Sequence, residues 1–299
     1  MPHKNKINID VSLVYRLVNA QFPQWTDLDV KPVEFSGWDN RTFHLGEHMS
    51  VRLPSAAEYS SQVEKEHIWL SKLAPLLPLQ IPMPLAMGKP AEGYPWHWSV
   101  YRWLDGETAS YDRITDLCQF ATALAEFLND LQKIDATGGP ISGRHNFYRG
   151  GLLSTYDAET RESIVALSNY LNTDVVTAIW NEAIDSTWQA PPVWVHGDIS
   201  VGNLLVEHGV LSAVIDFGCT CIGDPACDLA IAWTFFNGKS REMFRKTLQL
   251  DNATWARGRG WALWKALITC VPHSVIDNSE VEKARRVIDE IIDDYERCT

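Results

Sequence analysis

Long apolar runs and an excess of basic residues are both missing from this sequence. No stretch approaches the roughly 18 consecutive apolar residues of a membrane-spanning helix, so we expect no contact with a membrane. Lys and Arg number 26 against 38 Asp and Glu, which gives a formal net charge of -12. Nucleic-acid binding needs clustered Lys and Arg, so this balance argues against nucleic acid as the main partner. It is compatible with a cationic ligand, although most acidic proteins are acidic for solubility alone.

The sequence also lacks an apolar segment behind its polar N-terminus, and it has few cysteines. The first absence predicts a cytoplasmic protein without a secretory signal. The six cysteines are scattered, so we expect them to be reduced in that compartment. Cys219, Cys221 and Cys227 lie close together but have no second ligand pair, which favours small buried side chains over a zinc site.

Hydrophobic spacing changes character near residue 104. Before that point, Asp10 is placed as the N-cap of a helix, and residues 30–53 and 96–104 have the alternation of strands. Residues 56–73 between these strands have helical periodicity. Strands, one helix and strands again predict a compact α+β lobe.

After residue 104 the pattern is mostly helical. Apolar residues recur at helical spacing over residues 112–134, twice within residues 154–188, and near residues 228–236, 240–249, 254–269 and 279–297. We therefore predict an α+β fold with two lobes, a small antiparallel-sheet lobe over residues 1–104 and a larger helical lobe over residues 105–299. Ligands usually bind in the cleft between lobes, so we expect the functional site there.

An acid, an amide and a second acid form the most informative pattern in the second lobe. Asp198 stands five positions before Asn203, and Asp216 follows a short apolar run and precedes a Phe-Gly pair. Phosphoryl transfer needs one carboxylate at the attacking hydroxyl, and an amide and a carboxylate on Mg²⁺ beside the nucleotide phosphates. Asp198 is therefore the candidate catalytic residue, and Asn203 and Asp216 are the candidate metal ligands. An ordinary turn is the alternative for either segment taken alone.

Two further residues are expected to support this loop. Asp224 and Pro225 predict a helix start, with Asp224 as the N-cap and the proline in the first turn. That start puts Asp228 in the first turn, where a buried carboxylate is expected to accept hydrogen bonds from the loop. His196 is expected to hold the loop backbone rather than to transfer a proton.

Together these motifs resemble the aminoglycoside phosphotransferase family, which includes macrolide and choline kinases and has a protein-kinase-like fold. The resemblance covers nearly the whole chain. It rests on residues 196–203, 215–218 and 223–228, and on residues 51–54, Glu66 and residues 99–107 of the first lobe.

The resemblance implies two roles in the first lobe. Arg52 takes the position of the phosphate-binding cation on the third strand, where the commonest kinase pattern has lysine. Glu66 looks like the helix carboxylate that steadies this cation. Arginine can bind phosphate in a bidentate way, so activity need not be lost. The alternative for Arg52 is a surface position on an edge strand.

Two other nucleotide contacts follow from the resemblance. The segment that would cover the phosphates, residues 36–40, contains a single glycine, so Ser36 and Asn40 are the candidate donors. An ordinary hairpin turn is the alternative there. Residues 101–104 would be the hinge, where Tyr101 and Trp103 would meet the purine through backbone groups. Recognition by the backbone leaves ATP and GTP equally open.

The acceptor site is expected on helices of the second lobe. Its candidate residues are acidic, namely Asp157, Glu159, Glu162 and the acids of residues 279–297, although most of these fit the solvated face of a helix. Aromatic residues are dense in the same region, with Trp233, Trp255, Trp261 and Trp264 among them. A place in the core is favoured for them over a wall of the acceptor site.

The resemblance thus implies a small-molecule kinase. It would use Mg²⁺ to transfer the γ-phosphate of ATP or GTP to a hydroxyl of an aminoglycoside-like, macrolide-like or other small acceptor, with antibiotic resistance following if that acceptor were an antibiotic.

A protein kinase is disfavoured, because residues 218–224 are too few for a long activation loop and Gly197 stands where protein kinases carry arginine. Arg52 and the single loop glycine suggest a non-catalytic nucleotide-binding scaffold, which the intact acid and amide pattern opposes. The sequence leaves the acceptor and the oligomeric state open.

Overall fold

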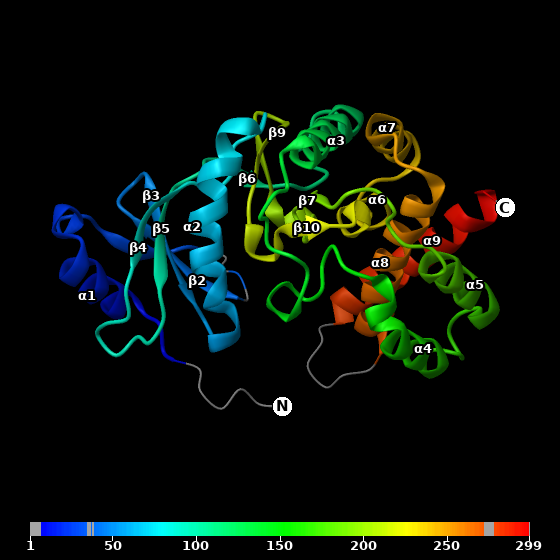
Figure 1. The fold of residues 1–299 in the computed structure, drawn as a ribbon, viewed down its shortest axis with the longest axis horizontal. Coiled ribbons are helices and arrows are strands. Elements are labelled where there is room, and N and C mark those ends of the chain that lie inside the picture. Colours follow the sequence, from blue (N-terminus) through cyan, green and yellow to red (C-terminus); the bar gives the residue numbers. More distant parts are fainter. Residues whose placement is uncertain (1–6, 35–36, 38, 272–277, 299) are drawn as a thin grey trace.

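The first lobe is built on a five-stranded antiparallel sheet (Figure 1). The computed structural model describes residues 7–34, 37, 39–271 and 278–298. The strands are β1 (Val30–Pro32), β2 (Asn40–Leu45), β3 (Met49–Pro54), β4 (Pro84–Gly88) and β5 (Trp98–Arg102), in the order β1-β2-β3-β5-β4. The sequence patterns predicted all of them except β4. This strand lies at the sheet edge and begins with proline, a residue that edge strands tolerate because it need not donate to the ladder.

Two helices flank this sheet. α1 (Val11–Gln21) begins after Asp10, whose carboxylate accepts a hydrogen bond of 2.8 Å from the Leu13 N–H, as the sequence predicted. The buried side chains of α1 pack against the sheet in a small core of their own. α2 (Ser61–Leu73) lies between the sheet and the second lobe (Figure 1), and its buried leucines belong to the larger core of that lobe. α2 therefore joins the two lobes.

The second lobe is mainly helical. Its helices are α3 (Leu117–Lys133), α4 (Asp157–Ala166), α5 (Thr173–Ile184), α6 (Ile231–Thr234), α7 (Gly238–Leu248), α8 (Asn252–Cys270) and α9 (Asn278–Cys298). α8 is buried on nearly all sides, because α4, α5 and α9 pack around it. None of the helices in the described ranges is both long and apolar enough to span a membrane.

The predicted helix starts were early in two places. The helix expected from residue 112 begins at Leu117, because the carboxylate of Asp116 accepts hydrogen bonds from the N–H groups of Cys118 and Gln119 and so caps it. The helix expected from residue 56 begins at Ser61, after a separate 3-10 turn at Ala57–Tyr59.

Short strands of the second lobe present the loops of interest. β7 (Val193–Val195) pairs with β10 (Cys221–Gly223), and β6 (Glu107–Thr108), β8 (Leu204–Glu207) and β9 (Val210–Val214) form a second small sheet. Residues 196–203 therefore join β7 to β8. Asp216 lies just beyond the end of β9.

Candidate active site

Asp198 and Asn203 lie together in the loop between β7 and β8. The side-chain Nδ2 of Asn203 donates to the Asp198 carbonyl oxygen at 2.9 Å and to its carboxylate Oδ2 at 3.0 Å. Both side chains are half-buried. The amide therefore fixes the direction of the carboxylate and leaves that carboxylate reachable by a ligand.

Asp228 fixes the backbone at the start of this loop. Its side chain is fully buried and accepts hydrogen bonds from the N–H groups of His196, at 2.8 Å, and Gly197, at 2.7 Å. Burial raises the pKa of the Asp228 carboxyl, against the opposing effect of His196 and the two N–H donors. Asp228 makes the contacts that the sequence suggested, and it acts on the loop backbone rather than on a ligand.

His196 connects the loop to the segment that carries Asp216. Its Nδ1 accepts a hydrogen bond of 3.2 Å from the Asp198 N–H, so the ring proton lies on Nε2. Nε2 is 3.0 Å from the Ile215 carbonyl oxygen, to which it donates. The buried ring thus sets the spacing between the two acid-bearing segments, as expected of a structural histidine.

Arg52 joins the two lobes through ion pairs with two carboxylates. It projects from β3, with its Nη1 3.8 Å from Glu66 on α2 and its Nη2 3.2 Å from Asp216. Asp216 itself has a φ of +66°, in the left-handed region that non-glycine residues seldom adopt. The buried hydroxyl of Tyr101 donates to the same Glu66 carboxylate. The structure therefore brings the predicted cation, its helix partner and the second acid into one cluster.

The two predicted hinge residues have other partners. Tyr101 lies in β5 between β3 and β4, and its side chain reaches Glu66. The Trp103 N–H donates to the His48 carbonyl oxygen at 2.8 Å, so that donor is already used within the protein. Neither finding supports the purine contact expected of Tyr101 and Trp103. Tyr101 instead reaches Arg52 through Glu66.

The segment before β2 brings a third acid to this cluster. Asn40 is buried at the start of β2, while Ser36 lies outside the described residues. Asp39 was not predicted, yet burial and the nearby Asp216 carboxylate raise its pKa. The only sign of Asp39 in the sequence was that it is a polar residue directly before Asn40, a predicted donor.

Lys65 is a second residue that the sequence did not indicate. Its ammonium group donates to the carbonyl oxygens of Gly218 and, at 3.2 Å, of Thr220. Burial lowers the pKa of Lys65. The lysine next to Glu66 therefore fastens α2 to the loop behind Asp216, while Glu66 faces Arg52.

Asn203 and Asp216 provide oxygen atoms of the kind that Mg²⁺ binds. Asn203 uses Nδ2 for both bonds to Asp198, which leaves its amide oxygen for a metal ion. Within the described ranges, no group of three His, Cys, Asp or Glu side chains is arranged to hold a metal. An ion at Asn203 and Asp216 would take its other ligands from phosphate and water, as Mg²⁺ usually does.

Residues 29–261 match the model of the phosphotransferase enzyme family, which is more than half of the chain. The chain belongs to this family. The enzyme class and the family resemblance inferred from the acid and amide pattern are thereby confirmed. No curated protein matches the sequence.

Solved structures with the same fold include other phosphotransferases. An aminoglycoside phosphotransferase in complex with GDP and kanamycin has a TM-score of 0.70 at 17% identity, over 95% of this chain and 98% of that chain. The streptomycin–ATP complex of APH(2")-IIa has a TM-score of 0.60 at 19% identity, over 96% and 97%. A macrolide 2'-phosphotransferase from Brachybacterium faecium has a TM-score of 0.59 at 18% identity, over 94% and 98%. These matches confirm the two-lobed, protein-kinase-like α+β fold.

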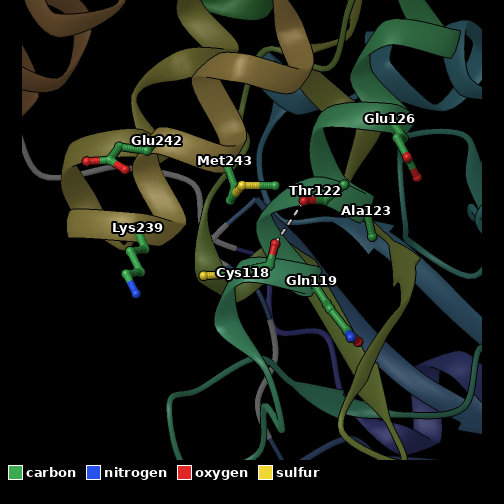
Figure 2. A pocket seen from close by; sticks show the side chains of 8 residues that line it. All are labelled: Cys118, Gln119, Thr122, Ala123, Glu126, Lys239, Glu242 and Met243. Atoms are coloured by element: carbon green, nitrogen blue, oxygen red, sulfur yellow. Dashed lines mark hydrogen bonds between the residues drawn. The ribbon is translucent and has the colours of Figure 1, made fainter.

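An open hollow of about 480 Å³ lies elsewhere on this phosphotransferase, between α3 and α7. Figure 2 shows its lining, in which Lys239 and Glu242 of α7 lie opposite Cys118, Gln119 and Glu126 of α3. None of the three acids of the cluster described above lines it. The hollow is therefore separate from the candidate active site.

The cysteines near the site are packed within the phosphotransferase. Cys221 is buried and its Sγ donates to the Arg149 carbonyl oxygen at 3.0 Å. Cys227 is buried beside Asp228, whereas Cys219 is half-buried. Burial raises the pKa of the Cys219 and Cys221 thiols to about 12. These cysteines are packed as protonated thiols, which are poor metal ligands.

Proposed function

We propose that this phosphotransferase transfers the γ-phosphoryl group of ATP or GTP to a hydroxyl group of a small molecule. The observation that carries the proposal is the position of Asp198. Asn203 orients its carboxylate, and the carbonyl next to Asp216 is linked to the same loop through His196. Nucleotide complexes of two proteins with this fold, one with GDP and one with ATP, support the choice of co-substrate.

In the proposed reaction, Asp198 accepts a hydrogen bond from the acceptor hydroxyl and aims its oxygen at the γ-phosphorus. A bond forms between the hydroxyl oxygen of the acceptor and the γ-phosphorus. At the same time the bond from the γ-phosphorus to the β,γ-bridging oxygen breaks. The hydroxyl proton passes to Asp198 and then to water, and the nucleoside diphosphate leaves with the bridging electron pair. Asp198 is thus assigned to orientation and proton acceptance.

The remaining residues of the cluster act on the phosphates. Arg52 is held by Glu66 in a position to pair with phosphate oxygens, which a guanidinium can bind in a bidentate way. Asn203 and Asp216 would hold Mg²⁺, which neutralises charge on the phosphates when it is bound. His196 and Asp228 hold the loop of Asp198 in place through hydrogen bonds to backbone groups.

Replacement of the proposed catalytic acid tests this function. We expect Asp198→Ala to lower the rate of phosphoryl transfer by roughly two to four orders of magnitude, since it removes a positioned base. Affinity for the magnesium nucleotide should change little, as measured by calorimetry. Asp174→Ala is the matched control, because Asp174 is exposed in the first turn of α5. Undiminished transfer by Asp198→Ala would refute the assignment.

A screen of acceptors tests the reaction class. Purified protein, magnesium nucleotide and a panel of hydroxyl compounds that includes aminoglycosides and macrolides should yield a nucleoside diphosphate only with a true acceptor. Nucleotide binding without turnover on any acceptor would support the alternative, a nucleotide-binding scaffold with this fold. A phosphorylated polypeptide in place of a small molecule would support a protein kinase.

A further inference from the structure

Arg149 is fastened to the loops of the candidate active site through its backbone. The buried side chain of Asn146 donates to the carbonyl oxygens of Arg149, at 3.1 Å, and Cys219, at 3.2 Å. The Cys219 carbonyl oxygen lies 2.6 Å from the point where a Cβ on Gly197 would be. Gly197 directly precedes Asp198, so Asn146 and Cys219 connect the backbone of Arg149 to the loop of the proposed catalytic acid.

Among the described residues, the guanidinium of Arg149 has aromatic neighbours but no ion-pair partner. It lies 5.0 Å from the ring centre of Trp261 and 5.1 Å from that of Trp264. Its Nε is buried and has no hydrogen-bond partner in the described part of the chain. The described residues offer it no ion pair, since none of their carboxylates lies within 4.0 Å of its nitrogens.

The buried arginines of the same lobe do have such partners. Arg257 pairs with Asp224 at 2.6 Å and Arg259 pairs with Glu182 at 2.8 Å. Arg241 pairs with two acids of α9. Arg149 is half-buried, with a buried Nε, and partial removal of a cation from water without an anion is costly, so its lack of an ion pair among the described residues stands out against this pattern.

Lys265 adds a second cation beside Arg149. It follows Trp264 on α8, is exposed, and has no carboxylate of the described residues within ion-pair distance. Although the residue as a whole is exposed, desolvation of its ammonium group and the charge of Arg149 lower the pKa of Lys265, while the charges of Asp198 and Glu159 raise it. Lys265, Arg149 and Asp198 therefore share one electrostatic environment.

Glu159 does not neutralise this pair by direct contact. Its carboxylate accepts a hydrogen bond of 2.9 Å from the Trp264 indole N–H. Tyr156 stacks on Trp264, with the two ring centres 3.9 Å apart. The region next to Asp198 thus presents two cations, whereas two of the acids expected to bind an acceptor have partners within the protein, Glu159 with Trp264 and Asp157 with Trp180 and Arg161.

We infer that the acceptor of this enzyme carries an anionic group, a carboxylate or a phosphate, which Arg149 and Lys265 bind while Asp198 receives its hydroxyl. The inference rests on the proposed phosphoryl transfer and narrows its substrate class. Guanidinium and ammonium groups bind such anions through charge-assisted hydrogen bonds, and a polycationic acceptor would be repelled by both. The net charge of the whole chain is compatible with a cationic ligand. We infer that the two cations near Asp198, rather than this net charge, decide which acceptor binds.

Four hydroxyl compounds of one scaffold test the inference. They are 4-(hydroxymethyl)benzoate, its methyl ester, 4-(hydroxymethyl)phenyl phosphate and 4-(aminomethyl)benzyl alcohol, and kcat/KM is measured for each from release of the nucleoside diphosphate. We expect at least one anion to exceed the neutral ester by roughly tenfold to a hundredfold, and the amine to be poorest. The two anions separate a carboxylate from a phosphate site.

Variants assign the preference to the two cations. Lys265→Met and Arg149→Met should each lower kcat/KM for the preferred anion by roughly tenfold or more and leave the value for the ester almost unchanged. Arg245→Met and Lys239→Met are matched controls: Arg245 is a half-buried arginine 5.0 Å from the ring centre of Trp255, and Lys239 is an exposed lysine of the separate hollow. Lys265 is exposed, so its variant should fold even if that of Arg149 does not.

The outcomes separate the two proposals. Turnover with the ester, the amine or an aminoglycoside that equals or exceeds turnover with both anions would overturn the anionic acceptor and leave phosphoryl transfer standing. An anion preference that survives both variants would overturn the role of Arg149 and Lys265. Nucleotide binding with no turnover on these compounds or on any member of the wider acceptor panel would overturn the proposed function and the inference together.

Discussion

Arg52 and Asp216 form an ion pair of 3.2 Å, although 164 residues separate them in the chain. Arg52 also lies 3.8 Å from Glu66, which is 4% exposed. One guanidinium thus links the sheet, α2 and the segment behind β9. A change at Arg52 is expected to alter both the stability of the protein and its affinity for nucleotide.

Arg52→Ala should destabilise the protein by about 3 kcal/mol, because it leaves the buried Glu66 carboxylate without a cation. Nucleotide affinity should fall in the same variant, while Arg52→Lys should keep part of both properties. Urea denaturation and nucleotide titration measure the two effects. Arg102→Ala is the control, since Arg102 is exposed at the end of β5. Equal behaviour of Arg52→Ala and Arg102→Ala would contradict the structural role of the ion pairs.

Lys65→Met should separate α2 from the loop behind Asp216, because it removes the donor to the Gly218 and Thr220 carbonyl oxygens. As a positioning residue, Lys65 should affect kcat and the apparent affinity for Mg²⁺ more than KM for the acceptor. Steady-state kinetics over a range of Mg²⁺ concentrations provide this comparison. Lys72→Met, at an exposed position of the same helix, should leave these constants unchanged. A loss confined to thermal stability would argue that Lys65 is only structural.

Gly197→Ala should disrupt the loop of Asp198 for two reasons. Gly197 has a φ of +85°, and an added Cβ would lie 2.6 Å from the Cys219 carbonyl oxygen. Gly93→Ala separates these reasons, because Gly93 has a φ of +82° and nothing within 4 Å of the added atom. We expect Gly93→Ala to cost about 1–2 kcal/mol in backbone strain and Gly197→Ala clearly more, with loss of transfer. Equal unfolding free energies for the two variants would contradict the steric argument.

Alkylation of Cys219 should depend steeply on pH. Its thiol pKa is raised to about 12, chiefly by burial and by the charge of Asp198. The thiolate is the reactive form and forms as the pH rises toward this pKa, so the rate should increase about tenfold per pH unit between pH 8 and 10. Iodoacetamide labelling with peptide mass spectrometry measures it, with the half-buried Cys118 as the internal comparison. A fast, pH-independent reaction at Cys219 would contradict the raised pKa.

Local features of the sequence predicted much of the fold. The spacing of apolar residues indicated α3 to α9 and most of the strands, and Asp10 and Asp224 were placed at helix starts where their side chains do accept backbone hydrogen bonds. Strand β4 was missed because it is an edge strand in a proline-rich stretch. The two early helix starts were wrong because a cap and a separate turn, rather than periodicity, decide where those helices begin.

The candidate site likewise contains residues that the sequence could predict and residues that it could not. Asp198 and Asn203 lie five residues apart in one loop, so their contact was within reach of a reading of the sequence. Lys65 and Arg149 gave no local signal, and Asp39 was marked only by its place next to Asn40. The purine contacts expected of the Tyr101 and Trp103 backbone stay a prediction, while the structure shows the Tyr101 hydroxyl on Glu66 and the Trp103 N–H on the His48 carbonyl.

The sequence by itself determined the order of the elements, the caps of several helices and the acid and amide pattern in one loop, because these depend on neighbours along the chain. The tertiary structure alone decided which charges meet. Arg52 reaches Asp216 and Lys65 reaches the carbonyls behind it only because α2 packs between the lobes. The tertiary structure also leaves Arg149 and Lys265 without acidic partners among the described residues. Ion pairs form between groups that are close in space, and periodicity along the chain does not encode that distance.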